Sequence, residues 1–521
     1  MSKFNTKQVR AHVSSPVQTV VGDQPQTNHQ GGSGYVRDAK SELFLLAMSN
    51  MVSEKTFYED GQIRDDRFAA LVRHIAAEDF EWLRGLLGWL RSTGNMRTAS
   101  IVGAIEAVQA RLNLGLYENL GDLVDSVLQR PDEVGEYLAA RTALHGKNLS
   151  KSERWGLSKA VRRMYTQRNV LKYDTASHAF RFADALELLH VDTKDETQVN
   201  LFRYLLNQKN FKDGSVEDLD MLLKNRNWRE MTKSPTVYKN ALLDPDFVKA
   251  AGITWEEILS TLGSVIPKKD LWEAVIPSMG HMALIRNLRN FDEQGVSDVI
   301  ASVVAAKIAD PNEVTRGKQF PFRYLAAYQT APSLRWAHAL EQALTHSLSN
   351  VPVLKGRTLV LVDRSGSMWS PMSGKSQLNC ADAAALFGIA LALRAENATL
   401  VQFGSTSKEI HLPKGGSLLK LMSLFGDLGG THTKQAVLAH YKGHDRVVII
   451  TDEQTSSYND PSEAVPAHVP MYTWNIGGYR LAQNASDKNR HTFGGLTDAA
   501  FRQIHWLENA KNAVWPWLDQ R

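Results

Sequence analysis

Oxygen-bearing side chains follow an apolar run near residue 360 at a spacing that suits a metal ion. Residues 359–362 are typical of a strand buried on both faces, and Asp363, Ser365 and Ser367 follow at alternate positions. Gly366 allows a turn that brings one carboxylate and two hydroxyls to one point beyond the strand. Such ligands favour a hard divalent cation, Mg²⁺ before Ca²⁺, because water and a partner's oxygen can complete an octahedron.

Two later segments supply more oxygen ligands. Residues 429–433, GGTHT, predict a flexible loop before a helix, and residues 445–452, DRVVIITD, predict a second buried strand ending in an acid. If both strands are parallel in one sheet, Thr431 and Asp452 join the first three residues at its carboxyl edge, where open α/β sheets place their ligands. The alternative is that the two serines only cap the next helix while Asp363 serves a turn.

The segments DRSGSM, GGTHT and TD, in that order, resemble the metal-ion-dependent adhesion site of a von Willebrand factor A domain. The resemblance implies one divalent cation, Mg²⁺ before others, bound by Asp363, Ser365, Ser367 and Thr431. Asp452 is expected to bind it directly or through water.

Motifs for catalysis are missing from the sequence. GxSxG, the nucleophile elbow, and GxxxxGK[ST], the nucleotide loop, are both absent. The acids at the expected sheet edge converge on one cation, which does not fit two-metal nuclease chemistry. We therefore expect a protein that is not an enzyme.

Length and composition indicate an ordinary multidomain protein. The 521 residues allow two or more domains, and 60 basic against 56 acidic residues give a formal charge of +4, which neither favours nor excludes nucleic acid. The single cysteine, Cys380, excludes an internal disulfide. No signal peptide or transmembrane segment is recognisable, so we expect a cytoplasmic protein without membrane contact.

The chain divides into three parts by pattern. Residues 1–33 are polar and end in GGSG, which predicts a mobile arm or a strap on the folded body. Residues 34–350 read as successive amphipathic helices, and residues 351–521 read as the doubly wound alternation of the A domain. The last segment, NAVWPWLDQR, is aromatic and is expected to dock on the helical domain. The expected helices cover residues 41–51, 65–90, 96–112, 120–128, 155–165, 179–189, 197–206, 216–223, 255–262, 271–288, 296–309, 379–395, 418–425, 434–441 and 498–509.

So many helices in series favour an irregular α-solenoid of HEAT-like repeats. A compact multi-helix domain is the alternative. The fold class expected is thus multidomain, α plus α/β, and a curved stack of helices could form a ring closed by the C-terminal A domain.

Basic residues cluster locally. Residues 151–181 hold eight Lys or Arg against two acids, and Lys159 and Arg163 are four apart, so they share one helix face that can hold phosphates. Arg323 lies among the aromatics Phe320 and Phe322, a combination that suits single-stranded RNA. The alternative is that these residues form solvated helix faces and core.

The motif order WGLSKA (155–160), MG followed by ALIRNLRNF (279–291), FPFRYL (320–325) and a C-terminal A domain resembles the Ro autoantigen family. The resemblance runs from about residue 35 to the end, and a bacterial or phage-borne member is expected. It implies a TROVE module of HEAT-like repeats that forms a ring closed by the A domain. It also implies binding of small noncoding Y RNA on the outer surface and of single-stranded ends of misfolded RNAs through the central hole.

Further partners follow from the same resemblance. Bacterial family members assist RNA maturation or decay and can be tethered by Y RNA to polynucleotide phosphorylase. We expect a monomer. The alternative function is a protein-interaction scaffold whose metal site captures an acidic side chain of a partner.

Lys159 and Arg163 fall where the family has RNA-contacting basic residues after its WG motif. The family's histidine in the next segment is replaced near Arg181, although His178 is close. The RNA-binding residues expected from charge and resemblance together are Lys159, Arg162, Arg163, Arg168, Lys172, Arg181, Arg286, Arg289 and Arg323.

Overall fold

The computed structural model describes most of the chain. The described residues are 15–20, 26–49, 53–212, 214–216, 218–331, 333–348, 351–372, 378–411, 418–455, 460–486, 489–495, 504, 508 and 514–518. They form two compact units, one of residues 1–99, 320–326 and 344–521 and one of residues 100–319 and 327–343. Within the described part, no helix has the length and apolar character that crossing a membrane requires.

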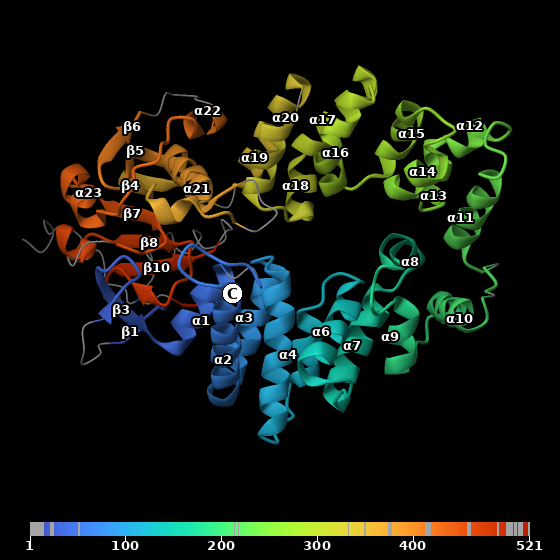
Figure 1. The fold of residues 1–521 in the computed structure, drawn as a ribbon, viewed down its shortest axis with the longest axis horizontal. Coiled ribbons are helices and arrows are strands. Elements are labelled where there is room, and N and C mark those ends of the chain that lie inside the picture. The colour runs from blue at the N-terminus through green and yellow to red at the C-terminus, as the bar shows by residue number, and fades with distance from the viewer. Residues whose placement is uncertain are drawn as a thin grey trace, which may run out of the picture. The chain divides into compact units, whose positions relative to one another are not determined.

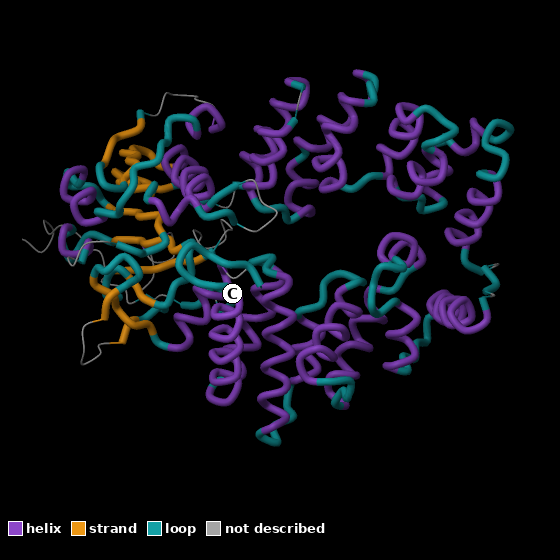
Figure 2. The backbone as a smooth tube through the Cα atoms, viewed as in Figure 1, coloured by secondary structure: helices purple, strands orange, loops and turns teal. Residues whose placement is uncertain are grey.

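The second unit consists of helices joined by short connections, and Figures 1 and 2 show them following one another along the chain. Its described residues include no strand. The helices that lie in it wholly or in part are α4 (Arg97–Asn113), α5 (Leu120–Ser126), α6 (Glu133–His145), α7 (Lys151–Met164), α8 (Gln167–Tyr173), α9 (Phe182–Leu189), α10 (Glu196–Phe211), α11 (Asp220–Met231), α12 (Lys239–Leu242), α13 (Pro245–Ala250), α14 (Trp255–Leu262), α15 (Lys268–Val275), η1 (Ile276–Ser278), α16 (His281–Glu293), α17 (Asp298–Ala309), α18 (Pro311–Gly317), α19 (Pro321–Thr330), η2 (Leu334–Trp336) and α20 (Ala337–Ser347).

The first unit combines a six-stranded sheet with three N-terminal helices and a small second sheet. Its further elements are β1 (Thr19–Val20), β2 (Gln26–Thr27), β3 (Ser33–Arg37), α1 (Ala39–Ser49), α2 (Gly61–Glu78), α3 (Phe80–Ser92), β4 (Leu354–Asp363), η3 (Gly366–Trp369), α21 (Cys380–Arg394), β5 (Ala395–Phe403), β6 (Ser407–Ile410), α22 (Leu418–Met422), α23 (Thr433–His440), β7 (Arg446–Thr451), η4 (Pro461–Ala464), β8 (Met471–Asn475), β9 (Leu481–Ala482) and β10 (Arg490–Gly494).

The large sheet has the order β10-β8-β7-β4-β5-β6, and every pair is parallel except β5 with β6. Alternate residues of the central strand β4 face opposite sides. Leu359 and Leu361 belong to the core cluster that includes Val437 of α23, while Val362 contacts Gly388 of α21. This confirms the expected doubly wound architecture, in which helices cover both faces of a buried parallel strand.

Two of the long helices expected from the sequence are interrupted in the structure. Residues 65–90 are interrupted at Asp79, whose N–H donates to Ile75 O at 2.8 Å and whose side chain accepts from Trp82 N at 3.1 Å. Asp79 thus ends α2 and caps α3. Residues 271–288 are interrupted at Pro277, which lacks the N–H that a continuous helix needs. The expected helix over residues 498–509 lies almost wholly outside the described residues.

Both ends of the chain contribute to the first unit. Within the expected N-terminal arm, β1, β2 and the start of β3 are described, and β3 pairs with β9. Near the other end, Trp515 and Trp517 stack on each other at 5.4 Å and pack against Phe44, Trp82 and Trp89 of α1 and α3. The expected docking of the aromatic C-terminal segment on N-terminal helices is confirmed.

Candidate metal site and nucleic-acid interface

Asp363 stands at the carboxyl end of β4, fixed by two donors. Its Oδ1 accepts from Ser365 N at 2.8 Å, and its Oδ2 accepts from Thr451 Oγ1 at 2.6 Å. β4 and β7 are adjacent and parallel, so their ends meet at one edge of the sheet. Thr451 ends β7, and Asp452 is the next residue. The two acids expected to share a site therefore come from neighbouring strand ends.

Loop contacts bring the three hydroxyl residues to the same edge. The backbone bridge of Ser365 with Gly429 includes a hydrogen bond from Gly366 N to Gly429 O at 2.7 Å, which brings the Thr431 loop to the turn after β4. Ser365 Oγ and Ser367 Oγ lie 3.4 Å apart. Thr431 also accepts at its carbonyl from the Thr455 hydroxyl at 3.1 Å. The five residues predicted from the sequence thus gather at one edge.

Asp363 and Asp452 are buried together, which makes ionisation of their carboxyl groups unfavourable. Burial raises the pKa of Asp363 to about 6. Burial and then the negative charge of Asp363 raise the pKa of Asp452 to about 7. Arg364 carries the nearest formal positive charge in sequence, but its guanidinium donates to the carbonyls of Ala381 and Gly426. A cation bound beside Asp363 and Asp452 would offset their negative charges.

The donor set fits a divalent metal ion. It consists of carboxylate and hydroxyl oxygens, which hard cations prefer. Oδ1 of Asp452 accepts from Gln454 N at 3.0 Å, whereas its buried Oδ2 has no hydrogen-bond partner in the part of the chain that is described. Asp363, Ser365, Ser367 and Thr431 would hold the ion, with the free oxygen of Asp452 directed to it or to a bound water. The ion would supply two positive charges where the buried carboxylates need them.

The N-terminal part of the first unit covers this edge, which the sequence did not reveal. Tyr58 has its pKa raised to about 12 by burial and then by the negative charge of Asp452. The His29 ring stacks on Tyr58 at 5.0 Å, and the backbone N–H of His29 donates to Gln454 Oε1 at 3.0 Å. All five predicted metal ligands are at most 3% exposed. A ligand from solvent must therefore pass residues of this N-terminal cover.

Helix α7 presents a basic face in the second unit. Ser150 and Glu153 form a capping box at its start, and Glu153 also accepts from Arg141 at 2.8 Å. A Cβ built at Gly156 would lie 2.3 Å from Gly121 O, so only glycine allows α5 and α7 to pack this closely. Trp155 is 48% exposed beside this contact. The WG motif therefore fixes the position of α7 on α5.

Lys159 and Arg163 project from that face, as predicted, and both meet the same acid. Asp125 lies 3.2 Å from Lys159 Nζ and 2.6 Å from Arg163 Nη2. Lys159 also lies 3.3 Å from Asp122 and 5.0 Å from the centre of the Trp155 ring. The face combines two half-exposed cations with an aromatic ring, and its ion pairs are exposed and weak enough for a phosphate to compete.

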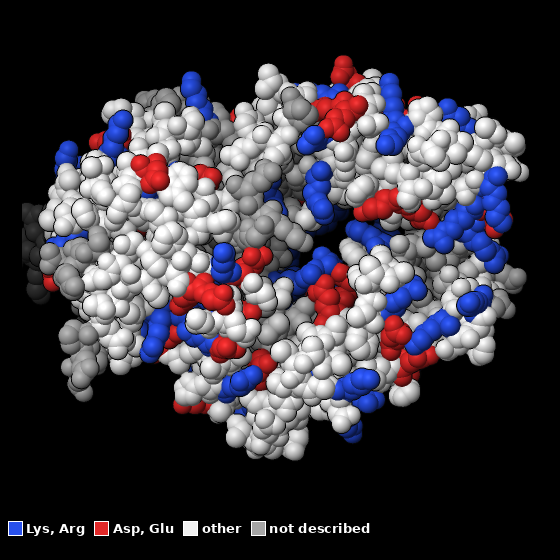
Figure 3. Space-filling view, viewed as in Figure 1, with Lys and Arg blue, Asp and Glu red and all other residues white. Residues whose placement is uncertain are grey.

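The other predicted RNA contacts are exposed but do not form one cluster with Asp125. Arg162 pairs with Asp192 at 3.1 Å, Arg181 with Asp174 at 2.6 Å and Arg289 with Glu293 at 2.7 Å. Figure 3 accordingly shows basic and acidic side chains beside one another over much of the face in view. The remaining predicted residues are exposed at the surfaces of α8, α16 and α19, namely Arg168, Lys172, Arg286 and Arg323.

A second group of positive side chains, around Lys307, was not predicted from the sequence. Lys307 of α17 has its pKa lowered, first by burial and also by the positive charges of Arg316, Lys249 and Arg168. These residues come from α18, α13 and α8. Because they lie far apart along the chain, the sequence carries no local signal that their charges act together on Lys307.

Comparisons with known proteins give one family match and one similar sequence. Residues 250–342 match the TROVE domain family. A mouse protein, telomerase protein component 1, is 34% identical over 83 residues, which are 16% of this chain and 3% of that protein. The chain therefore spans only a small fraction of this relative.

A solved structure shares the fold over nearly the whole chain. The crystal structure of the Deinococcus radiodurans Ro (RSR) protein matches with a TM-score of 0.61 and 17% sequence identity, covering 90% of this chain and 99% of that one. The match includes both the helical repeats and the A domain. The TROVE match and the shared fold make the chain similar to TROVE-domain proteins and to this Ro protein, and the motifs WGLSKA, ALIRNLRNF and DRSGSM lie in that order along it.

Proposed function

We propose that this protein binds RNA and that the face of α7 is a principal contact surface. The TROVE match over residues 250–342 supports the general activity, because TROVE proteins are RNA-binding proteins. The proposed location of the RNA contact rests on one observation: Lys159 and Arg163 pair with the same acid, beside the exposed Trp155. Phosphates can replace Asp125 as partner of both cations, and an unpaired base can stack on the indole.

The proposed RNAs are of two kinds. One is a small noncoding Y-type RNA bound on the outer surface, and the other is the single-stranded end of a misfolded RNA, bound through the central hole of a ring. The protein then assists RNA quality control, maturation or decay in the cytoplasm without catalysing a reaction itself. Polynucleotide phosphorylase, tethered through RNA, is the proposed nuclease partner of a monomeric protein.

The carboxyl edge of the large sheet, where Asp363 and Asp452 lie, suggests a second candidate function. We propose that Asp363, Ser365, Ser367, Thr431 and Asp452 bind one Mg²⁺, because the two acids are buried together and Asp452 Oδ2 lacks a hydrogen-bond partner among the described residues. In that case the protein acts as a scaffold whose cation captures an acidic side chain of a partner. Metal-dependent capture of a protein, abolished by Asp363→Ala, distinguishes this function from RNA binding.

The test is crosslinking and sequencing of the RNA that copurifies with the protein. The parent is compared with a Lys159→Glu, Arg163→Glu variant shown to be folded by circular dichroism. A Lys224→Glu, Lys233→Glu variant makes the same change in charge at and beyond α11. It serves as the control, since these lysines pair with nearby residues of their own segment, Asp220 and Glu230.

A discrete hairpin RNA, or RNAs with unpaired 3′ ends, should be recovered with the parent and the control and lost from the α7 variant. If no RNA is enriched over background while a protein partner is, the RNA function is wrong and the metal-site scaffold becomes the leading account.

A further inference from the structure

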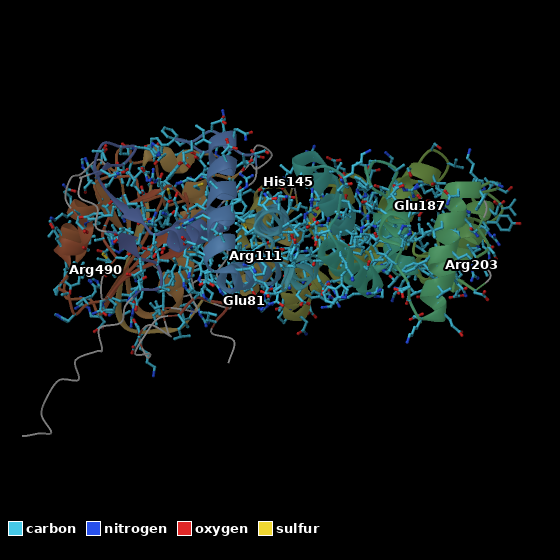
Figure 4. All side chains as sticks on the ribbon, turned by 90° about the horizontal axis from the view of Figure 1, so that it is seen from below. Glu81, Arg111, His145, Glu187, Arg203 and Arg490 are labelled. Atoms are coloured by element: carbon cyan, nitrogen blue, oxygen red, sulfur yellow. The ribbon has the colours of Figure 1, made fainter. Side chains whose placement is uncertain are left out.

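A pocket of about 70 Å³ lies on α10, in the second unit. Four residues of α10 line it at the helical spacing i, i+3, i+4 and i+7, namely Asn200, Arg203, Tyr204 and Asn207. Figure 4 labels Arg203 on this helix. The buried residues of α10 lie on another side of the helix and are Leu201, Phe202 and Leu205. The face that α10 turns toward the pocket is therefore polar, with one aromatic ring in it.

Tyr204 supplies this ring, and the chain holds it in place. The side chain is half-buried. A Cβ built at Gly214 would lie 2.7 Å from Cδ2 of the ring, so the segment before α11 packs on the tyrosine through backbone alone. A ring held in this way offers a fixed surface on which an unpaired base can stack.

The polar groups of the pocket hold one another loosely. Asn200 Nδ2 donates to Asp218 Oδ2 at 3.4 Å, and Arg203 Nη1 donates to Asn200 Oδ1 at 3.5 Å. Good N–H···O hydrogen bonds are shorter, at about 2.9–3.0 Å. Arg203 and Asp218 are also exposed. A ligand with matching groups can therefore replace these long contacts at little cost.

The pocket combines a carboxylate with a guanidinium, and this combination suits guanine. Guanine carries two adjacent donors, N1–H and the N2 amino group, which both oxygens of a carboxylate can accept. It also carries two acceptors, O6 and N7, to which a guanidinium donates in a bidentate manner. Adenine lacks the N1–H and the N2 amino group, and uracil would place a carbonyl oxygen against the carboxylate of Asp218. The donor and acceptor pattern therefore favours guanine over the other bases.

The start of α10 lies against the end of α7, whose basic face is the proposed RNA contact. Gln198 Nε2 donates to the carbonyls of Arg162 and Tyr165 at 2.9 and 3.1 Å. Because Asn200 follows two residues later, a strand bound on α7 needs little further length to reach the pocket. This continuity favours a base of an RNA strand as the occupant.

Positive charge also acts on the ring of Tyr204. Burial raises the pKa of its hydroxyl, and the negative charge of Asp174 adds to this rise. Three positive charges oppose it, those of Arg229, Arg226 and Arg181. Phosphates on either side of a base at this ring would be attracted by the same charges.

We propose that the α10 pocket binds an unpaired guanine base, stacked on Tyr204. In this arrangement Asp218 accepts from N1–H and the N2 amino group, and Arg203 donates to O6 and N7. The proposal rests on the RNA binding proposed above and adds selectivity for a base, which a face that holds phosphates does not provide. The space has room for the polar edge of one base and not for two stacked bases.

The experiment measures base selectivity with the full chain, freed of copurified RNA by high salt. The probes are fluorescently labelled uridine decamers that carry guanosine, inosine or adenosine at one central position, and their affinities are measured by anisotropy at one fixed salt concentration. Asp218→Asn replaces an oxygen that should face the guanine donors by an amino group. Asp220→Asn makes the same change in charge two residues away, where the acid pairs with Lys224, and is the matched control. Thermal unfolding reports whether each variant is folded.

The parent should bind the guanosine decamer at least about fivefold more tightly than the adenosine decamer. Inosine should lie between them, because it lacks only the N2 amino group. In Asp218→Asn the preference for guanosine should fall below about twofold, whereas Asp220→Asn should keep it. Equal affinity of the parent for guanosine and adenosine decamers overturns the proposal and leaves RNA binding by α7 standing. A preference that Asp218→Asn retains also overturns it.

Guanosine monophosphate identifies the source of the base. If the base comes from RNA, the guanosine decamer should bind the parent more tightly than the mononucleotide, since flanking phosphates add contacts. Equal affinities assign the pocket to a free nucleotide. If no decamer binds the parent, the RNA function proposed above fails. The pocket then survives only if calorimetry shows that the mononucleotide binds the parent and binds Asp218→Asn more weakly.

Discussion

Thr451 Oγ1 donates to Asp363 Oδ2 at 2.6 Å and so joins the ends of two adjacent parallel strands at the centre of the sheet. The other oxygen of this carboxylate accepts from Ser365 N. Together the two hydrogen bonds fix the orientation of the Asp363 carboxylate without a bound ligand.

Thr451→Val removes this donor and leaves a buried carboxylate oxygen with one partner fewer. We expect the free energy of unfolding in urea to fall by about 1–3 kcal/mol, the usual cost of a buried unsatisfied group. Thr473→Val is the control on the neighbouring strand β8, because the buried Thr473 hydroxyl has no hydrogen-bond partner among the described residues. Equal destabilisation by the two variants would contradict this role of Thr451.

Asp452→Asn should have opposite effects on stability and on metal binding. In EDTA at pH 8 the charged Asp452 is buried against Asp363, so removing its charge should raise the free energy of unfolding by at least about 1 kcal/mol. The gain should shrink as the pH falls through about 7 toward 4, since Asp452 is then protonated in the folded state.

The same variant should weaken Mg²⁺ binding at least about tenfold by calorimetry. Asp460→Asn, which keeps the hydrogen bond to Ser462 N that an amide oxygen can accept, should leave Mg²⁺ affinity unchanged. A variant that loses stability in EDTA and binds Mg²⁺ normally would rule out a metal role for Asp452.

Asp125→Asn should strengthen RNA binding. Asp125 pairs with both Lys159 and Arg163, so it competes with phosphate for the two cations. We expect the dissociation constant for a single-stranded RNA at low salt to fall about two- to threefold, since exposed ion pairs contribute little energy. Asp220→Asn removes a similar exposed pair with Lys224 and should change nothing. An unchanged or weaker affinity in Asp125→Asn would place the RNA elsewhere.

His491 should make stability depend on pH. It is 2% exposed on β10, next to Arg490, which Figure 4 labels, and burial lowers its pKa to about 4. Because the unfolded chain takes up a proton near pH 6.5 and the folded chain does not, the stability from His491 is complete above 6.5 and is lost as the pH falls toward 4.

His491→Gln removes that titration. Between pH 7.5 and 4.5 the difference in unfolding free energy between parent and variant should therefore shrink by about 2–3 kcal/mol, measured in urea at both values. A difference that stays constant over this range would show that His491 accepts its proton normally when folded.

Gly85→Ala should destabilise the protein, although alanine is the better helix former by about 1 kcal/mol. A Cβ at residue 85 would lie 2.5 Å from Cδ1 of Trp517, so the docked indole would have to move. In a Trp517→Ala background the same substitution should become neutral or stabilising. Thermal unfolding of the four proteins in this cycle measures the coupling, and additive effects would exclude the contact.

The sequence by itself determined the local chemistry of both sites. The apolar run ending in Asp363, the alternate serines and the second strand before Asp452 identified the sheet edge, because the direction of a parallel strand fixes where its last residues lie. In the same way, helical spacing placed Lys159 and Arg163 on one face. The split of residues 65–90 at Asp79 was missed, since a capping acid inside an apolar period gives little local signal.

The tertiary structure alone decided what surrounds these residues. Arg64, Tyr58 and His29 reach the sheet edge of Asp363 and Asp452 from parts of the chain nearly 300 residues or more away. The charges of Lys249, Arg316 and Arg168, from three other helices, act on Lys307. Periodicity shows which face of an element is apolar but not which element will cover it. That choice depends on the shape of the packed side chains, such as the close contact at Gly121 and Gly156, and so exists only once the chain has folded.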